Sequence, residues 1–159
     1  MATRSTIALL RDNGEVVKVY SHWDGYLECN GEILFKHYNT PEKIEALLAQ
    51  GDISSLGTSV GEQHPFGPDY NNRGSDADKA HDAAKEAGWT TFYGRDRGEH
   101  GTGAKVYKDL AEYEAKAQFE EFNYCFIYGN WYYTSYDGIV RSVEDGLAAI
   151  AAKELKEAA

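Results

Sequence analysis

The sequence is short of positive charge and of cysteine, and it has no long apolar run. Lys and Arg together number 16 against 26 Asp and Glu, so the formal net charge is −10. An acidic chain repels a nucleic-acid polymer, and we therefore expect no direct binding of a DNA or RNA strand. The same acidity would let the protein imitate nucleic acid and occupy a basic surface on a partner protein.

Only two cysteines occur, Cys29 and Cys125, and they lie far apart with no CxxC motif. This usage fits free thiols in a reducing compartment, with a single disulfide as the alternative. The apolar run from Ile7 to Leu10 is too short for the core of a signal peptide, and no run approaches the length of a membrane span. We therefore expect a cytosolic protein without a membrane partner.

The chain does contain clear hairpin signals. Two pairs of apolar segments predict β-hairpins, namely 5–11 with 15–22 and 122–128 with 131–136. Asn13-Gly14 lies in the first turn and Gly129-Asn130 in the second, and such residues tolerate the positive φ of tight turns.

One of these strands has two different faces. In segment 15–22, Val17 and Val19 alternate with Lys18 and Tyr20. Successive side chains of a strand point to opposite sides, so one face of this strand is mixed and partly wet.

Amphipathic periodicity and capping residues predict several helices, at about 41–50, 76–87, 109–118 and 144–158. Thr40 is suited to cap the first helix and Ser75 or Asp76 the second, and Gly51 and Gly88 are suited to end them. The pattern of segment 26–38 predicts either a helix or, as the alternative, one more hairpin that turns at Asn30-Gly31.

These elements predict a single α+β domain over residues 1–159, with an antiparallel sheet, hairpins and helices mainly on one face. The domain would carry a flexible glycine-rich loop at about 57–75 and a C-terminal helix at about 144–158.

Segment 89–103 is the most suggestive for function. Trp89 to Tyr93 predicts a strand, and the glycine-rich segment after it holds Arg95 and Arg97. Two guanidiniums in a glycine loop favour an anion or phosphate site, because each offers a fork of donors. The alternative is a solvated turn in which the arginines pair with Asp96 or Glu99.

The turn at 22–26 supplies aromatic and polar side chains for the same site. We predict a small-molecule pocket where the end of the 89–93 strand meets this turn, with aromatic rings that stack a base and arginines that hold phosphates. The candidate ligand-binding residues are His22, Trp23, Asp24, Tyr26, Tyr93, Arg95 and Arg97.

No motif for catalysis or for a cofactor is present. The sequence lacks Gly-x-Ser-x-Gly, HExxH, the phosphate-loop motif and the dinucleotide fingerprint. His22 and Asp24 with His37, or Glu99 with His100, would be the best metal ligands, but such pairs are more often structural or solvated. We therefore predict no catalytic residue, no metal and no cofactor.

Several short motifs, in this order, resemble small proteins encoded by tailed bacteriophages. They are His22-Trp23-Asp24-Gly25-Tyr26-Leu27, Gly51-Asp52-Ile53-Ser54-Ser55-Leu56-Gly57, Thr91-Phe92-Tyr93-Gly94-Arg95-Asp96-Arg97-Gly98-Glu99 and Phe119-Glu120-Glu121-Phe122-Asn123-Tyr124. The resemblance covers roughly residues 2–133. It implies phage origin and action in the cytoplasm of an infected bacterium, and it assigns no catalytic residue.

The pocket and the resemblance together lead to one hypothesis, a counter-defence protein that binds and sequesters a small nucleotide immune signal, cyclic nucleotides included. Two alternatives stay open. The protein could be an acidic inhibitor or DNA mimic directed at a host defence protein, or it could degrade the signal with His22, Asp24 or His100. A homo-oligomer is compatible with each of these.

Overall fold

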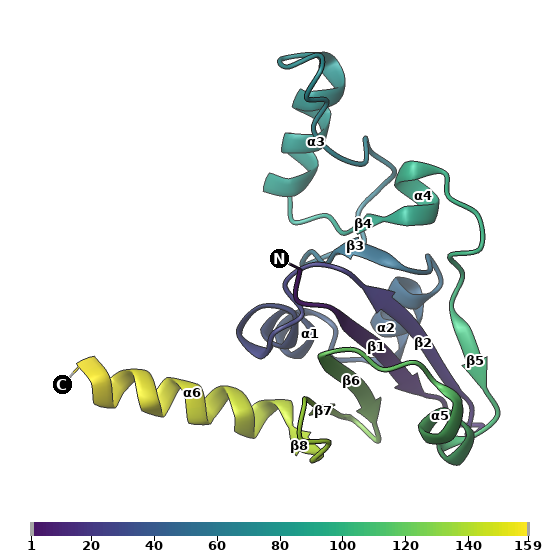
Figure 1. Cartoon of the computed structure of the whole chain (residues 1–159), viewed down its shortest axis with the longest axis vertical. Coiled ribbons are helices and arrows are strands. Elements are labelled where there is room, and N and C mark those ends of the chain that lie inside the picture. The colour runs from purple at the N-terminus through teal and green to yellow at the C-terminus, as the bar shows by residue number, and fades with distance from the viewer. Residues whose placement is uncertain (1, 159) are drawn as a thin grey trace.

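A hairpin of two central strands organises the fold (Figure 1). The computed structural model describes residues 2–158, and in it β1 (Ser5–Leu10) pairs antiparallel with β2 (Val16–Ser21). A second hairpin joins β6 (Phe122–Ile127) to β7 (Asn130–Thr134). Both predicted hairpins are thus present, and the second turns at Tyr128-Gly129, whose φ values are 46° and 86°.

The sheet is mixed, which corrects the prediction of a purely antiparallel one. β1 pairs parallel with β6, and β2 pairs parallel with β3 (Ile53–Ser55). Parallel neighbours need long crossover connections. The helical segment 27–48 connects β2 to β3, and much of the chain separates β1 from β6. Hairpin signals are local, so they reveal only the antiparallel pairs.

Four short strands complete the eight-stranded sheet, whose order is β4-β3-β2-β1-β6-β7-β8 with β5 attached to β2. β4 (Thr91–Phe92) pairs antiparallel with β3, and β8 (Arg141–Ser142) with β7. β5 (Lys105–Tyr107) runs antiparallel to the first half of β2.

Seven helical segments are found in residues 2–158: η1 (Leu27–Gly31), α1 (Glu32–His37), α2 (Pro41–Leu48), α3 (Asp76–Glu86), α4 (Tyr93–Arg97), α5 (Leu110–Lys116) and α6 (Val143–Ala158). Segment 26–38 is therefore helical rather than a hairpin. The predicted caps are present, because Thr40 accepts a hydrogen bond from the Lys43 N–H and Ser75 from that of Asp78. Segment 93–97 is one helical turn where the sequence predicted an open loop.

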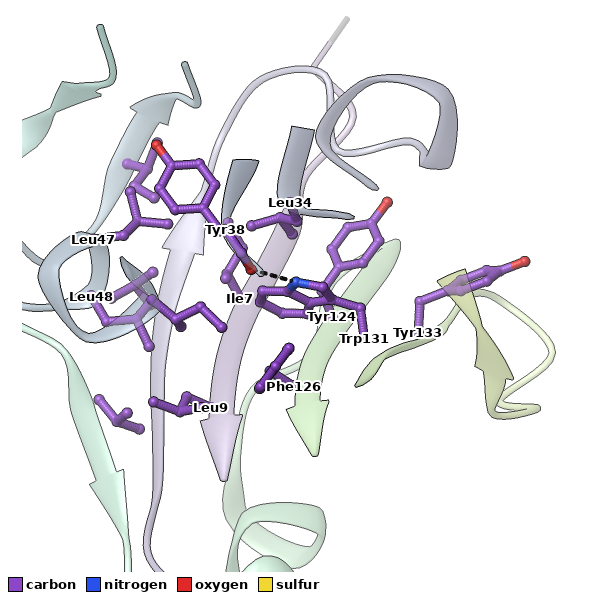
Figure 2. Packing of buried hydrophobic residues seen from close by; sticks show 14 of the residues in the cluster. Ile7, Leu9, Leu34, Tyr38, Leu47, Leu48, Tyr124, Phe126, Trp131 and Tyr133 are labelled. Carbon is purple, nitrogen blue, oxygen red and sulfur yellow. Dashed lines mark hydrogen bonds between the residues drawn. The ribbon is translucent and has the colours of Figure 1, made fainter. Parts of the chain in front are cut away.

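The main hydrophobic core lies on one face of the sheet (Figure 2). Ile7 and Leu9 of β1 pack there with Val17 and Val19 of β2 and with buried side chains from η1, α1 and α2. Leu147 and Ile150, in the first half of α6, pack against the same cluster. The Trp131 Nε1–H donates to the carbonyl of Tyr38 at 2.8 Å, which ties β7 to the end of α1.

The glycine-rich segment 57–75 consists of two different halves. In the first half, Ser59 forms a parallel bridge with Trp89, and the His64 side chain is buried. In the second half, Tyr70 is 73% exposed. Residues 67–74 contain no buried side chain, but the N–H groups of Asp69 and Gly74 donate to the buried carboxylate of Asp78. The mobility of the loop stays a prediction.

The second half of α6 extends away from the sheet, and Leu155 is 74% exposed there (Figure 1). Among residues 2–158, no helix is long and apolar enough to cross a membrane.

Candidate functional site

The second face of the sheet carries the candidate site. Even-numbered residues of β1 and β2 point to this face, among them Thr6, Lys18 and Tyr20. Asn123 of β6 pairs with Thr6 in register, and the Thr6 hydroxyl donates to the Asn123 side-chain oxygen at 2.9 Å. A smaller cluster around Ala8 and Tyr113 of α5 covers one end of this face. The other end stays polar, as the mixed pattern of segment 15–22 predicted.

A polar cavity of about 200 Å³ lies at this end, and its lining residues come from β1, β2, β5 and the segments beside them. We call it the polar cavity and define it by Thr6, Lys18, Tyr20, Asp52, Lys105, Gln118 and Glu120.

Lys18 is the least expected member of the polar cavity. Its side chain starts from a central strand, and the residue is only 6% exposed. The ammonium donates one hydrogen bond within residues 2–158, to the Gln118 carbonyl at 2.8 Å. An ammonium has three donors, so two are left for water or for a ligand in the cavity. Burial lowers the pKa of Lys18, and the charge of Lys105 lowers it further.

Lys105 lies directly opposite Lys18 across the β2–β5 pair. Like charges in this arrangement repel each other and destabilise the sheet. Asp52 and Glu120 also line the cavity and partly offset the repulsion. Burial raises the pKa of Asp52, whose carboxylate accepts a hydrogen bond from the Tyr20 N–H at 2.9 Å. The polar cavity thus holds two cations and two carboxylates.

Tyr20 connects the polar cavity to the predicted turn at 22–26. Its hydroxyl lies 2.6 Å from His22 Nδ1, and the His22 ring meets Trp23 edge-on at a centroid distance of 4.7 Å. Burial raises the pKa of Tyr20, while the nearby Arg4 guanidinium acts in the opposite direction. Tyr93 raises this pKa slightly further.

A larger, mainly apolar cavity of about 510 Å³ adjoins the polar one. It lies between α5 and strands β6 and β7, and we call it the apolar cavity. Aromatic and aliphatic side chains form much of its lining, among them Tyr113, Phe119, Ile127, Tyr132, Tyr136 and Val140. Cys125 lies in the same wall, where burial raises the pKa of its thiol to about 12. Glu120 lines both cavities.

Strand β3 brings the two predicted stretches together. The N–H groups of His22 and Trp23 donate to the carbonyls of Ile53 and Ser54, and the N–H of Tyr93 donates to the carbonyl of Asp52. The turn at 22–26 and the end of β4 therefore lie on either side of one strand.

Arg95, however, has a structural role that removes it from the candidate phosphate site. Its guanidinium has five N–H donors, and all five are used. Three of them bond to the carbonyls of Val60, Gly61 and Thr90, and two to the carboxylate of Asp96. This pairing with Asp96 is the alternative that the sequence left open, and it leaves no donor for a ligand.

Arg97 and Tyr93 remain accessible. Arg97 is exposed, lies 3.8 Å from Glu99 and stacks over the ring of Phe66 at 5.0 Å. Phe66 in turn packs on Tyr93 at 5.5 Å between ring centroids. Trp23 and Tyr26 are 44% and 39% exposed, so both rings could contact a ligand.

Asp24 forms part of the turn through its left-handed backbone conformation and does not cap the helical segment that follows. It has a φ of 57°, and the helical segment that follows has no side-chain cap. The Tyr124 hydroxyl donates to the Gly25 carbonyl at 2.7 Å, which anchors the turn in the core.

Sequence reasoning missed both cavities, because none of the seven predicted ligand-binding residues lines either of them. Lys18, Asp52, Lys105 and Glu120 were not among the predicted site residues. Within residues 2–158, no three His, Cys, Asp or Glu side chains gather in a way that could hold a metal ion. Comparisons of the chain with protein-family models, with curated proteins and with solved structures find no match. Function is therefore inferred from the chemistry of the two cavities.

Proposed function

We propose that this protein binds a small nucleotide in the polar cavity and sequesters it, as a phage counter-defence protein that removes a nucleotide immune signal in the cytoplasm of an infected bacterium. The observation that carries the proposal is the Lys18–Lys105 pair, which faces a cavity across two adjacent strands. An anion between the two ammonium groups would relieve their repulsion and accept hydrogen bonds from their free N–H donors.

The charge balance favours a ligand with few negative charges. Asp52 and Glu120 sit in the same lining and would repel a linear triphosphate. A phosphodiester carries one negative charge, which two lysines and two carboxylates can accommodate. A cyclic nucleotide therefore fits the polar cavity better than a nucleoside triphosphate does.

The geometry favours binding over degradation of the signal. His22 Nδ1 is occupied by the Tyr20 hydroxyl, and within residues 2–158 His22 and Asp24 share no hydrogen bond. His100 is exposed, away from the lining of either cavity. A histidine without a carboxylate to orient its ring is a poor candidate for a general acid or base.

The competing function is inhibition of a host defence protein. The net charge of −10 supports it, because an acidic surface can occupy a basic site on a partner. This function makes no use of Lys18 and Lys105, so variants of these lysines separate it from nucleotide binding.

Calorimetry of the purified protein against a panel of cyclic and linear nucleotides tests the proposal. We expect a cyclic nucleotide to bind, and Lys18→Met or Lys105→Met to weaken its binding about tenfold to a hundredfold, as loss of a charge-assisted hydrogen bond does. Lys79→Met is the matched control, because Lys79 is exposed on α3 and lines neither cavity.

Heat release of the bound ligand distinguishes the binder from the enzyme, since a binder returns the nucleotide intact. If no nucleotide binds, and a host protein is recovered from lysate at one-to-one stoichiometry instead, the sequestration proposal fails and inhibition replaces it.

A further inference from the structure

We infer that the apolar cavity is the base subsite of the same ligand, and that Glu120 makes it selective for guanine. The inference rests on the proposed function, because it takes the phosphate to lie in the polar cavity. It adds the identity of the base, which the lysine pair does not determine.

The size and lining of the apolar cavity suit a planar ring. Its volume of about 510 Å³ falls within the range of small-molecule pockets, roughly 300–1,000 Å³. Tyr113 and Phe119 meet edge-to-face at a centroid distance of 5.3 Å. Tyr136 is 81% exposed at the rim, so its ring is available to stack on a base.

Glu120 stands at the boundary between the two cavities. Its backbone is fixed by Asn123, whose side-chain oxygen accepts from the Glu120 N–H and whose side-chain nitrogen donates to the Glu120 carbonyl, each at 2.9 Å. Within residues 2–158, however, its carboxylate has neither a hydrogen-bond donor nor an ion-pair partner within 4.0 Å. The backbone of Glu120 is thus fixed, and its free carboxylate is available to accept hydrogen bonds from a ligand.

A carboxylate distinguishes the bases by their donors. Guanine presents a ring N1–H and an exocyclic N2 amino group side by side, and both can donate to one carboxylate. Adenine presents one amino group beside a ring nitrogen that is an acceptor, and this acceptor faces the carboxylate unfavourably. Hypoxanthine keeps the N1–H and lacks the N2 amino group.

The lysines and Glu120 therefore require a ligand that is an anion at one end and a hydrogen-bond donor at the other. The Lys18–Lys105 side takes an anion, and the Glu120 side takes N–H donors next to an apolar ring. A guanine nucleotide with a single phosphodiester meets both requirements.

Calorimetry with 3′,5′-cyclic GMP, cyclic IMP and cyclic AMP tests the inference. We expect cyclic GMP to bind about tenfold to a hundredfold more tightly than cyclic IMP, which lacks one charge-assisted hydrogen bond, and cyclic AMP to bind more weakly still. Glu120→Gln should remove most of this preference, whereas Glu154→Gln, in the exposed half of α6, should leave it unchanged.

A second pair of variants tests the cavity itself. Val140 lines the rim and is 66% exposed, so Val140→Trp should block the cavity without unfolding the protein and should weaken cyclic GMP binding. Ile139→Trp is the matched control, because Ile139 is exposed beside it and lies outside the lining.

The outcomes separate the two proposals. If the three cyclic nucleotides bind equally and Lys18→Met weakens all of them, the guanine subsite is refuted while nucleotide sequestration stands. If none of the three binds and other nucleotides do, the guanine subsite is again refuted. If no nucleotide in either panel binds, both proposals fall.

Discussion

Arg95 and Arg97 are two residues apart on one helical turn, yet they should respond very differently to removal. Arg95 is largely buried and donates to a carboxylate whose side chain is 0% exposed. Arg97 is exposed, and its nearest acidic partner lies 3.8 Å away. Arg95→Ala should therefore destabilise the protein, and Arg97→Ala should leave its stability almost unchanged.

The magnitude follows from what Asp96 loses. In wild type its carboxylate accepts two hydrogen bonds from Arg95 and one each from the N–H groups of His64 and Phe92. Arg95→Ala removes the arginine cation from this buried charge and keeps the two backbone donors, with the His64 ring nitrogen at 3.6 Å. Breaking a buried ion pair from one side destabilises a protein by about 3–5 kcal/mol. An exposed pair contributes roughly 0–1 kcal/mol, which bounds the effect of Arg97→Ala.

Urea denaturation followed by tryptophan fluorescence measures both values. With slopes of about 1–3 kcal/mol per molar urea, a loss of about 3–5 kcal/mol should lower the midpoint of Arg95→Ala by roughly 1–5 M. Domains of this kind have free energies of unfolding of about 5–15 kcal/mol, so the variant should still fold well enough to measure. Equal midpoints for Arg95→Ala and Arg97→Ala, with unchanged slopes, would refute the structural role assigned to the Arg95–Asp96 pair.

Three further predictions concern charge, thiols and the glycine-rich segment. Burial depresses the pKa of Lys18 in the folded protein below its ordinary value of 10.5, so the unfolded chain holds this proton more tightly than the folded protein does. The wild-type protein therefore gains stability as the pH rises from the folded-state pKa to the unfolded-state pKa. Lys18→Met should thus be at least as stable as wild type near neutral pH in urea titrations, with an advantage that shrinks as the pH rises towards 10.5; an advantage that grows would contradict this. Native alkylation at mildly alkaline pH should label Cys29 before Cys125. Burial raises the pKa of both thiols, but Cys29 is only partly buried, whereas the pKa of the buried Cys125 is raised to about 12; mass spectrometry showing the reverse order would argue against the burial of Cys125. Trypsin should cut first at Arg73 in the exposed half of the glycine-rich segment, and early cuts elsewhere with Arg73 intact would count against its mobility.

Turn and capping residues in the sequence correctly predicted those elements that depend on interactions between residues close together in the chain. Asn13-Gly14 marked a real hairpin turn, and Thr40 and Ser75 cap the helices that they were expected to cap. The helices at 26–38 and 109–118 formed with boundaries a few residues shorter. Each of these depends on side chains within one turn of the element.

Pairing between distant segments could not be predicted in this way. β3 is three residues long with two serines, and it is a strand only because β2 and β4 lie on either side of it. The predicted strand 89–93 shortens to Thr91–Phe92 because α4 begins at Tyr93. The strand character of β3 thus depends on tertiary neighbours, which override weak local propensity.

The candidate site shows the same division. The alternation of Lys18 and Tyr20 with Val17 and Val19 predicted a mixed face, and that face is where the polar cavity lies. Asp52 and Lys105 belong to distant segments and join it only through the β2–β5 pair and the connection to β3. Arg95 looked like an anion ligand because its partners, apart from Asp96, are backbone carbonyls that a sequence does not display.

The contrast between the two faces of β2 carries the case for function. Val17 and Val19 face a cluster whose buried members are all aliphatic or aromatic, which is what a central strand needs for stability. Lys18 sits between them on the other face, in a central strand, with a depressed pKa and a second lysine opposite. An apolar residue at position 18 would stabilise the fold, since it would remove both the buried charge and the repulsion. We propose that this destabilising cation is retained because a ligand needs it, and its cost to stability then supports the proposed binding site.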